Sequence, residues 1–299
     1  MNELISVIMS AYNESYAELE RSIGSILAQT YSNIELIIVN DNPNNIELKT
    51  ILNTITDERV KIFSNEKNIG LVNSLNKSVH LSKGNLIARM DADDISMPER
   101  LEVQYKYMQE KCLDMVGADI QFINEVGDVT VERFHFPTTQ DQILLNIKYG
   151  NCLAHPTWLV KKEIYLDLHG YRNVKSCEDY DFVLRVLNKG IYQVGNVPIV
   201  CLQYRLRQYG ISKQTEAEQY VLRDYLSKNR EIIDNINEDD IGLYMESNSF
   251  KKSVMKYKNY QTLKKQFRQT RSAKYFIRII INKYFYKVQM EKFHQKWRE

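Results

Sequence analysis

The sequence contains no hydrophobic run long enough to cross a membrane. No window of the 299 residues approaches the ~18 uninterrupted apolar residues of a transmembrane helix, and the N-terminus leads into a predicted strand without a signal-like segment. The four cysteines, which are Cys112, Cys152, Cys177 and Cys201, lack C-x-x-C spacing, which argues against a zinc site and a disulfide framework. Isolated thiols are typical of a reducing cytoplasm. We therefore expect a cytoplasmic protein that is soluble or peripheral to a membrane.

Two glycine-rich phosphate-binding motifs are also missing. No G-x-G-x-x-G follows the first predicted strand, and no G-x-x-x-x-G-K-[ST] occurs anywhere in the chain. Their absence disfavours nicotinamide cofactors and ATP as ligands. The sequence has no internal repeat, low-complexity tract or Pro/Gly-rich linker either, so the chain is predicted to be one enzyme-sized domain with an appendage.

Strand-like and helix-like segments alternate over residues 1–110. Apolar stretches at 4–10, 34–39, 60–64 and 87–90 are predicted strands, and 16–29, 46–55, 70–81 and 98–110 are predicted helices. This alternation predicts an α/β fold with a doubly wound, mostly parallel sheet. A hairpin is predicted over 115–131, followed by helices at 141–149, 161–168 and 178–188 and strands at 191–194 and 199–204.

Three carboxylates follow the fourth predicted strand within four residues. Asp91, Asp93 and Asp94 come directly after the segment that ends in Arg89 and Met90. Carboxylate oxygens are the ligands that Mg²⁺ and Mn²⁺ prefer, and these cations leave coordination positions open for substrate phosphates. The alternative is an acidic turn that caps the helix opened by Pro98.

Polar residues also follow the other predicted strands of this half. They are Ala11, Tyr12, Asn13 and Glu14 after the first strand, Asp41 after the second, and Asn68 and Gly70 after the third. In an open α/β sheet, ligands bind beyond the carboxyl ends of the strands, so these loops could line one site with the acidic cluster. Alternatively, the segment around Asn68 and Gly70 is an ordinary turn before a helix.

The order of these motifs resembles the family 2 glycosyltransferases, which are inverting enzymes of the GT-A fold that use nucleotide-diphospho-sugars. The matching motifs are the 11–14 loop, Asp41, 68–71 with 74–76, 91–94, His155-Pro156-Thr157, Gly170-Tyr171, and 178–182 with Leu184-Arg185. The resemblance covers residues 4 to about 212. The Gln-x-x-Arg-Trp signature of processive synthases is missing, so addition of a single sugar is expected.

The resemblance implies a role for each acidic motif. Asp91 would contact the nucleoside and ribose and help to hold the metal, Asp93 would ligate Mn²⁺ or Mg²⁺, and Asp94 would support them or cap a helix. Asp179 would be the general base that takes the acceptor proton, with Glu178 beside it, and burial together with Glu178 and Asp181 would raise its pKa. The alternative is that Glu178 and Asp179 only favour a helix N-terminus.

The resemblance also implies a donor-binding set of residues. Asp41 would hydrogen-bond uracil, although Asn40 replaces the first of two adjacent Asp residues in the common pattern. Ala11, Tyr12, Asn13, Glu14, Asn68, Gly70 and Arg89 would line the rest of the nucleotide-sugar site. Many relatives place a His on the segment leading to Ser212, where this chain has Arg207. A guanidinium cannot ligate a cation but pairs with phosphate, so we expect Arg205 or Arg207 to clamp the diphosphate on a closing loop.

Two aromatic residues are candidates for the acceptor side. His155 would lie beside the acceptor pocket or serve as a hydrogen-bonded structural residue. Trp158 could stack on a sugar ring, but its position favours the core. The sugar, expected to be a hexose or N-acetylhexosamine, and the linkage position are not encoded in these motifs.

The C-terminal segment differs in charge from the rest of the chain. Residues 251–299 carry fifteen Lys and Arg against two Glu, a net charge of +13, and residues 1–250 carry 25 against 36, a net charge of −11. A helix is predicted over 275–287, with Arg271, Lys274, Arg278 and Asn282 on one face and apolar residues on most of the remainder. Such a helix could lie in a membrane interface, or it could dock on the catalytic domain with a solvated basic face.

These observations predict three segments. Residues 1–110 would bind the nucleotide-sugar and 111–212 the acceptor, together forming a catalytic domain, and 213–299 would be a helical extension, basic from about 251. The expected function is transfer of a sugar from a UDP-linked donor to a glycan, expected to be lipid-linked, at the inner face of a bacterial membrane, in surface polysaccharide biosynthesis such as that of capsule or O-antigen. The alternative is a non-enzymatic scaffold whose basic tail binds nucleic acid, which leaves the acidic motifs unexplained.

Overall fold

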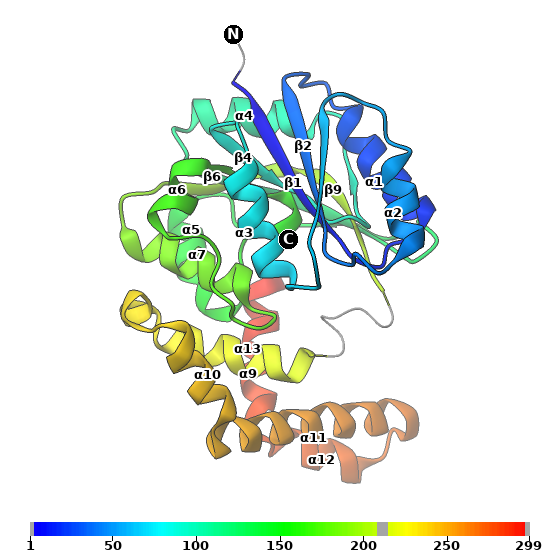
Figure 1. Ribbon diagram of the computed structural model, residues 1–299. Coiled ribbons are helices and arrows are strands. Elements are labelled where there is room, and N and C mark those ends of the chain that lie inside the picture. Colours follow the sequence, from blue (N-terminus) through cyan, green and yellow to red (C-terminus); the bar gives the residue numbers. More distant parts are fainter. Residues whose placement is uncertain (1–2, 208–214, 297–299) are drawn as a thin grey trace.

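A mixed β-sheet forms the centre of the protein, which is described by a computed structural model over residues 3–207 and 215–296. The sheet has nine strands in the order β3-β2-β1-β4-β8-β6-β9-β5, and β7 pairs with β6. Helices cover the faces of the sheet, and a set of C-terminal helices extends from one end of it (Figure 1). This arrangement agrees with the predicted α/β class.

The N-terminal half of the sheet is parallel. Its strands are β1 Ile5–Ala11, β2 Ile34–Asn40, β3 Val60–Ser64 and β4 Leu86–Arg89, and all of their pairings with one another are parallel. They alternate with α1 Tyr16–Leu27, α2 Ile46–Asn53 and α3 Leu71–Leu81. Strands β1 and β2 are almost fully buried, as continuous apolar runs in a covered parallel sheet should be. The predicted alternation is therefore confirmed.

The second half of the sheet mixes directions. It contains β5 Ile95–Ser96, β6 Met115–Ile123, β7 Val129–Phe134, β8 Leu159–Lys161 and β9 Val194–Arg205, with α4 Arg100–Glu110 between β5 and β6. The pairs β4–β8, β6–β8, β6–β7 and β5–β9 are antiparallel, and β6–β9 is parallel. The predicted β6–β7 hairpin is confirmed.

One prediction in this half is wrong. In place of the two strands predicted at 191–194 and 199–204, the structure has the single strand β9, which begins only at Val194 and continues through Pro198 with a bulge. Ala118 pairs with Val197 and Asp119 with Val200, so two residues of β9 are skipped. Pro198 has no N–H to give to the ladder, and such residues favour bulges.

Helices in the part of the chain after β7 complete the fold. They are α5 Gln140–Asn146, η1 Ile147–Tyr149, η2 His155–Thr157, α6 Lys162–Asp167, α7 Glu178–Lys189, α9 Glu216–Lys228, η3 Arg230–Asn235, α10 Glu238–Glu246, α11 Asn248–Thr270, α12 Ala273–Ile280 and α13 Lys283–Lys296. The single helix predicted over 275–287 is thus divided between α12 and α13. Its break coincides with Asn282, whose Oδ1 accepts a hydrogen bond of 3.0 Å from the N–H of Tyr284; this side chain competes with helical bonding.

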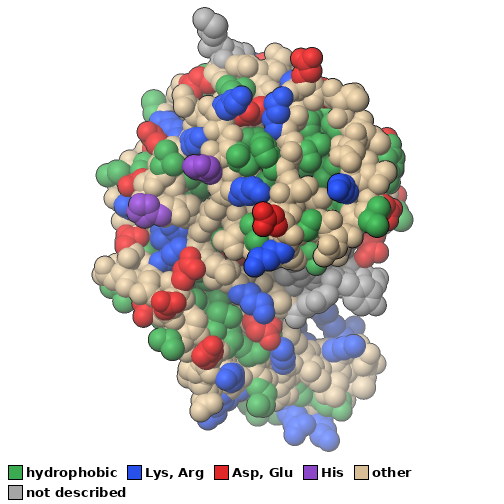
Figure 2. Space-filling model, viewed as in Figure 1, with side chains coloured by type: hydrophobic (Ala, Val, Ile, Leu, Met, Phe, Trp, Pro, Cys, Tyr) green, Lys and Arg blue, Asp and Glu red, His purple; other side chains and the backbone are tan. Residues whose placement is uncertain are grey.

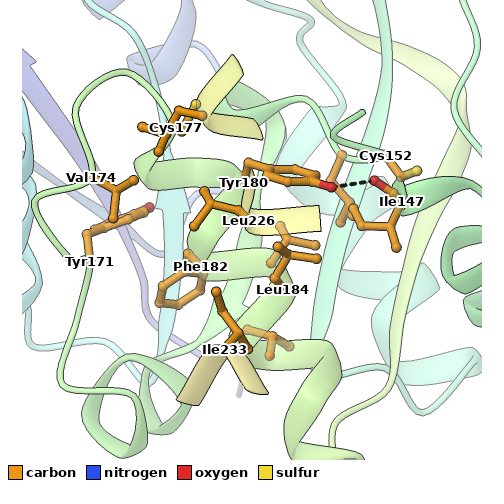
Figure 3. Close-up of a cluster of buried hydrophobic side chains, with 14 of the residues drawn as sticks. Ile147, Cys152, Tyr171, Val174, Cys177, Tyr180, Phe182, Leu184, Leu226 and Ile233 are labelled. Carbon is orange, nitrogen blue, oxygen red and sulfur yellow. Dashed lines mark hydrogen bonds between the residues drawn. The ribbon is translucent and has the colours of Figure 1, made fainter. Parts of the chain in front are cut away.

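Two hydrophobic clusters stabilise the protein. One contains residues of α1, α2 and α4 with the sheet, and the other joins α3, α5, α6 and α7 to residues of the C-terminal helices. In the second cluster Leu226 and Ile233 pack with Phe182 and Leu184 of α7 (Figure 3). The described part of the chain contains no helix that is both long and apolar enough to span a membrane.

Candidate active site

Polar loops from three parallel strands meet at one edge of the sheet. In register, Ala11 of β1 lies opposite Asn40 of β2, and Ile8 lies opposite Arg89 of β4. The loops are tied together, since Asn42 Nδ2 donates to the Oδ1 of Asn13 at 2.8 Å. The predicted gathering of the strand ends is confirmed, because β1, β2 and β4 are parallel neighbours.

The first loop leaves one aromatic ring exposed. The side chain of Glu14 turns back, and its Oε2 accepts a hydrogen bond of 2.7 Å from the N–H of Tyr12. Burial raises the pKa of Glu14 despite this bond. The ring of Tyr12 is 42% exposed, so it offers a flat surface at the edge where a ligand would bind.

Asp41 organises the loop that precedes α3. Its Oδ1 accepts hydrogen bonds of 2.8 Å from Asn65 Nδ2 and the N–H of Ile69, and its Oδ2 accepts one of 2.9 Å from the N–H of Gly70. Gly70 has a φ of 84°, which a residue with a side chain rarely adopts, and its N–H is also 2.9 Å from the Oδ1 of Asn68. Asp41 is only 3% exposed. It therefore has a structural role whatever ligand the loop binds.

The three carboxylates after β4 form a compact cluster. One oxygen each from Asp91, Asp93 and Asp94 lies within 4.8 Å of the others. Burial and the neighbouring carboxylates raise the pKa of Asp93 and raise that of Asp94 well above its usual range. The buried Oδ2 of Asp94 has no hydrogen-bond partner in the described part of the chain. A divalent cation would relieve this repulsion, so the donor set fits Mg²⁺ or Mn²⁺.

The alternative interpretation of the cluster as a helix cap is not supported. The N-cap residue of α4 is Glu99, whose side chain makes no capping hydrogen bond, and the N–H of Leu101 in the first turn donates to Gln29 Oε1 at 3.0 Å rather than to the acidic cluster. Instead, the Oδ1 of Asp94 accepts a hydrogen bond of 2.8 Å from the N–H of Arg205 at the end of β9. Asp94 therefore joins the acidic loop to β9, a supporting role that its position in the motif had suggested.

Arg89 pairs with the acidic cluster and acts electrostatically on the start of α7. Its buried guanidinium forms two contacts of 2.5 Å with the carboxylate of Asp91. Burial opposes the charge of Arg89, but Asp91 outweighs burial and the pKa of Arg89 is raised. Burial raises the pKa values of Glu178 and Asp179, and the positive charge of Arg89 offsets part of this increase. One guanidinium thus stabilises both acidic groups of the site.

The two arginines near the end of β9 differ in role. Arg205 is 4% exposed, and its guanidinium donates to the backbone carbonyls of Asp93 at 2.8 Å, Asn124 at 3.0 Å and Glu125 at 2.9 Å. Since these bonds fix Arg205 in the scaffold, it is poorly placed to clamp a diphosphate on a moving loop.

Arg207 is the arginine whose side chain reaches the open site. Its side chain is 33% exposed and pairs with Asp93 at 2.6 Å and with Glu18 at 3.0 Å. Glu18 was not anticipated from the sequence, where it reads only as part of the α1 capping box with Ser15. Ser212, at the end of the expected closing loop, lies outside the described residues.

Glu178 and Asp179 begin α7. The Oδ2 of Asp179 accepts a hydrogen bond of 2.8 Å from Asn151 Nδ2, and its Oδ1 accepts one of 2.7 Å from the N–H of Tyr180. Burial raises the pKa of Asp179, and Asn151 opposes this increase. Burial and the charge of Asp179 raise the pKa of Glu178 to about 7. Asn151 was missed in the sequence because no motif marks it.

Asp181 does not belong to this acidic group, contrary to the expectation that it would help to raise the pKa of Asp179. It is fully buried and pairs with Arg172 and, at 2.8 Å, with Arg185. Two guanidinium groups therefore neutralise it. The same helix is anchored at its start by Tyr180, whose hydroxyl donates to the carbonyl of Ile147 at 2.7 Å (Figure 3).

His155 and Trp158 lie in an aromatic cluster. The Nε2 of His155 is 2.9 Å from the hydroxyl of Tyr171, and its ring centroid is 4.4 Å from that of Trp158. Burial, together with Arg89, lowers the pKa of His155 well below its usual value, so the ring is neutral. Trp158 has no exposed surface. It is a core residue, as its position favoured, and presents no ring face to an acceptor.

Comparison with known proteins identifies the family. The family described as Glycosyl transferase family 2 matches residues 6–167. The chain is 39% identical to the O-antigen biosynthesis glycosyltransferase WbnJ of Escherichia coli over 235 residues, which cover 76% of this chain and 90% of the relative. It is 30% identical to the UDP-Glc:alpha-D-GlcNAc-diphosphoundecaprenol beta-1,3-glucosyltransferase WfgD of E. coli over 230 residues, 75% of this chain and 87% of the relative.

A solved structure supports the fold. The crystal structure of Staphylococcus aureus TarS residues 1–349 in complex with UDP matches with a TM-score of 0.59 and 18% sequence identity, covering 87% of this chain and 78% of that one. The complex of the same protein with UDP-GlcNAc gives a TM-score of 0.56. At this identity the match bears on the fold alone, and it agrees with the predicted GT-A architecture. The chain belongs to glycosyltransferase family 2 and is a glycosyltransferase.

Proposed function

We propose that this protein transfers one hexose or N-acetylhexosamine from a UDP-linked donor to a hydroxyl of a lipid-linked glycan, with inversion, in bacterial surface polysaccharide biosynthesis. The observation that carries the proposal is the position of Arg89, which pairs with the cation-binding cluster through Asp91 and acts electrostatically on Glu178 and Asp179. Arg89 thus links the residues proposed to bind the diphosphate to the residue proposed as the base.

The donor side is formed by the loops after β1, β2 and β3. We propose that the exposed ring of Tyr12 and the polar group of Asn13 contact the base and ribose, and that Asp41 and the loop of Asn68 and Gly70 bound the uracil. The Oδ2 of Asp41 accepts a hydrogen bond from the N–H of Gly70 and retains a second lone pair, which would accept a hydrogen bond from the uracil. The name of one relative supports the donor class, since WfgD is named for UDP-Glc.

Asp93, with Asp91, would hold Mn²⁺ or Mg²⁺. When bound, the cation would neutralise the charge that builds on the departing diphosphate. Arg207 would add a guanidinium to the same charge, and its present partner Asp93 is the residue that the cation would engage. We therefore propose Arg207, rather than Arg205, as the arginine that binds the diphosphate.

Asp179 acts as the base of the transfer. The oxygen of the acceptor hydroxyl forms a bond to the anomeric carbon, the bond from that carbon to the diphosphate oxygen breaks, and the nucleoside diphosphate leaves with the electron pair. The acceptor proton moves to a carboxylate oxygen of Asp179. Asn151 orients this carboxylate through its bond to Oδ2. A direct displacement of this kind on an α-linked donor gives a β-linked product.

The acceptor is proposed to bind on the side of α7 and the 150–155 loop. His155, neutral and hydrogen-bonded to Tyr171, would shape this side rather than exchange protons. In this division residues 1–110 bind the donor, 111–212 bind the acceptor, and 213–299 extend the enzyme toward the membrane. The lipid-linked acceptor is suggested by the diphosphoundecaprenol in the name of WfgD, and such a substrate would bring the enzyme to the inner face of the membrane.

A donor panel tests the proposal. UDP-, GDP- and TDP-sugars are incubated with the protein, with Mn²⁺ or with EDTA, and release of the nucleoside diphosphate is measured for wild type and Asp93→Ala. Turnover of one UDP-sugar that needs the metal and is lost in Asp93→Ala is expected. NMR of the purified product then gives its anomeric configuration. An α-linked product, or a GDP- or TDP-sugar as the preferred donor, would refute the proposal in its present form.

A further inference from the structure

The outer helix of the C-terminal region, α12, is apolar on two sides. Ile279 is 5% exposed and packs into the second hydrophobic cluster. On the opposite side Ile277 is 54% exposed and Ile281 75%, and Phe276 beside them is 47% exposed. Packing within the protein accounts for the first side only. Ile277 and Ile281, four residues apart, are neighbours on this second side, and Phe276 is next to Ile277 in the sequence with its ring against that of Phe267.

Basic residues border this exposed surface. Lys274 and Arg278 lie one turn apart along one edge of it, both are exposed, and neither has a carboxylate partner among the described residues. The sole acidic residue from 251 to 296 is Glu291. It is 8% exposed and is bound by Tyr220 at 2.9 Å and Arg223 at 3.2 Å. The charged residues that α11, α12 and α13 expose to solvent are therefore Lys and Arg, with no exposed carboxylate among the described residues of these helices.

The position of α12 makes this surface accessible. Helix α12 folds back along α11 through the left-handed residue Arg271, and the rings of Phe267 and Phe276 meet at a centroid distance of 5.5 Å. The two helices lie at the end of the molecule farthest from the sheet (Figure 1). Lys and Arg side chains gather at this end in the space-filling view (Figure 2).

The same helices are fixed to the acceptor side of the enzyme. Tyr284 of α13 donates from its hydroxyl to the carbonyl of Ser253 at 3.1 Å, and Glu291 joins α13 to α9. Helix α9 in turn contacts η1, where Ser227 Oγ donates to the carbonyl of Lys148 at 3.3 Å. Three residues later in the chain is Asn151, which positions Asp179. A partner bound to α12 would thus have a defined position relative to Asp179, the proposed base.

We infer that the exposed face of α12, formed by Phe276, Ile277 and Ile281 with Lys274 and Arg278 at its edge, docks on a lipid bilayer that contains anionic lipid. Apolar side chains that enter the acyl boundary, next to basic ones that meet anionic headgroups, are the features of an interfacial helix. A second copy of the chain is a weaker candidate, because two such positive surfaces would repel each other. The proposed function enters this inference only because a lipid-linked acceptor would give the enzyme a reason to dock on a membrane; the exposure and charge of α12 do not depend on it.

Vesicle binding of the full-length protein tests this directly and needs neither donor nor acceptor. Sedimentation with phosphatidylglycerol-containing and pure phosphatidylcholine vesicles is compared for wild type, Ile277→Asp/Ile281→Asp, Lys274→Glu/Arg278→Glu and the matched control Leu166→Asp/Ile191→Asp. The control residues are 61% and 69% exposed and lie on the catalytic part of the chain. Circular dichroism and the unfolding midpoint establish that each variant is folded.

We expect wild type and the control to bind the anionic vesicles equally, and both α12 variants to bind roughly tenfold or more weakly. Lys274→Glu/Arg278→Glu loses two basic residues, each of which contributes about 1 kcal/mol near an anionic surface. Ile277→Asp/Ile281→Asp loses the apolar side chains that would enter the acyl boundary. Added salt should weaken the binding. Equal binding by the α12 variants and the control, or no binding by wild type, would overturn the inference. If α12 variants instead changed a monomer–dimer equilibrium, the face would be a protein interface. Sugar transfer to a soluble acceptor should be unchanged in the α12 variants, so failure of docking leaves the proposed function intact.

Discussion

Arg207 Nε lies 2.6 Å from the Oδ2 of Asp93, so the partly exposed guanidinium after β9 pairs with the carboxylate that we propose as a cation ligand. The same arginine reaches Glu18 of α1 at 3.0 Å. This pairing connects three elements that are distant in the sequence. It also sets up a competition, because a divalent cation and Arg207 would both be attracted to Asp93.

This competition predicts opposite effects of Arg207→Gln on two ligands. Without the guanidinium, Asp93 is free, so Mn²⁺ should bind more tightly in the absence of nucleotide. UDP should bind about tenfold more weakly in the presence of Mn²⁺, because a charge-assisted hydrogen bond is worth about 1.5–3 kcal/mol. Titration calorimetry measures both affinities. Arg59→Gln, which removes a guanidinium from the surface pair with Asp57, is the control, and a loss of Mn²⁺ affinity in Arg207→Gln would argue against the competition.

The pH dependence of transfer follows from the raised pKa values at the start of α7. The base must be ionised, so the rate should fall as the pH decreases through the raised pKa of Asp179. Glu178 titrates nearby, with a pKa of about 7 against its usual 4.5. Since the charge of Asp179 is one cause of this increase, Asp179→Asn should lower the pKa of Glu178, which NMR titration of that side chain measures. An unchanged pKa of Glu178 in this variant would mean that the two carboxylates do not interact.

The same shift has a consequence for stability. The folded state holds the proton of Glu178 more tightly than the unfolded state, so between pH 4.5 and about 7 folding takes up protons at this site. The contribution of Glu178 to the free energy of unfolding is therefore fully present below pH 4.5 and is lost as the pH rises through about 7. Urea unfolding of wild type and Glu178→Gln at several pH values measures this difference.

Asn151 should act on the reaction through Asp179. Its amide stabilises the ionised carboxylate, so Asn151→Ala should raise the pKa of Asp179 and move the acidic limb to higher pH. The affinity for donor should not change, since no loop of the donor side is involved. Asn53→Ala, at the exposed end of α2, controls for loss of a surface amide. A uniform loss of rate at all pH values, with no movement of the limb, would point to a purely structural role.

The buried pair of Asp181 and Arg185 should be important for stability. Asp181→Asn leaves the guanidinium of Arg185, itself 4% exposed, without a full countercharge. Breaking one partner of a buried pair typically costs about 3–5 kcal/mol, and urea unfolding should show a loss of this order. The more exposed pair of Glu102 and Lys106 provides the comparison, since Glu102→Gln should change stability little.

Much of the fold and part of the site could be predicted from the sequence. The parallel strands and the polar residues after them are local features, so hydrophobic periodicity located them, and three carboxylates within four residues indicated a cation site. The contacts between distant segments could not be predicted in this way. Asn151 meets Asp179 across 28 residues, and Arg205 meets Asp94 across 111. Neither contact leaves a pattern in its own part of the sequence.

The errors have local physical causes. Two strands were predicted at 191–194 and 199–204, but pairing with the long strand β6 makes a single strand of Val194–Arg205, and a bulge accommodates Pro198, which has no N–H. Asn282 was assigned to the polar face of a continuous helix, yet its side chain bonds to the backbone and ends the helix. In both cases a side-chain or backbone hydrogen bond outweighed the periodicity of the apolar residues.

The most direct test of the account compares Asp179→Asn with wild type in donor binding and in transfer. The substitution keeps the size of the side chain and removes its basicity. The account predicts that Asp179→Asn binds the UDP-sugar with Mn²⁺ as tightly as wild type and transfers the sugar about 10²- to 10⁴-fold more slowly, the usual contribution of a general base. Transfer by Asp179→Asn at the wild-type rate would contradict the assignment of Asp179 as the base.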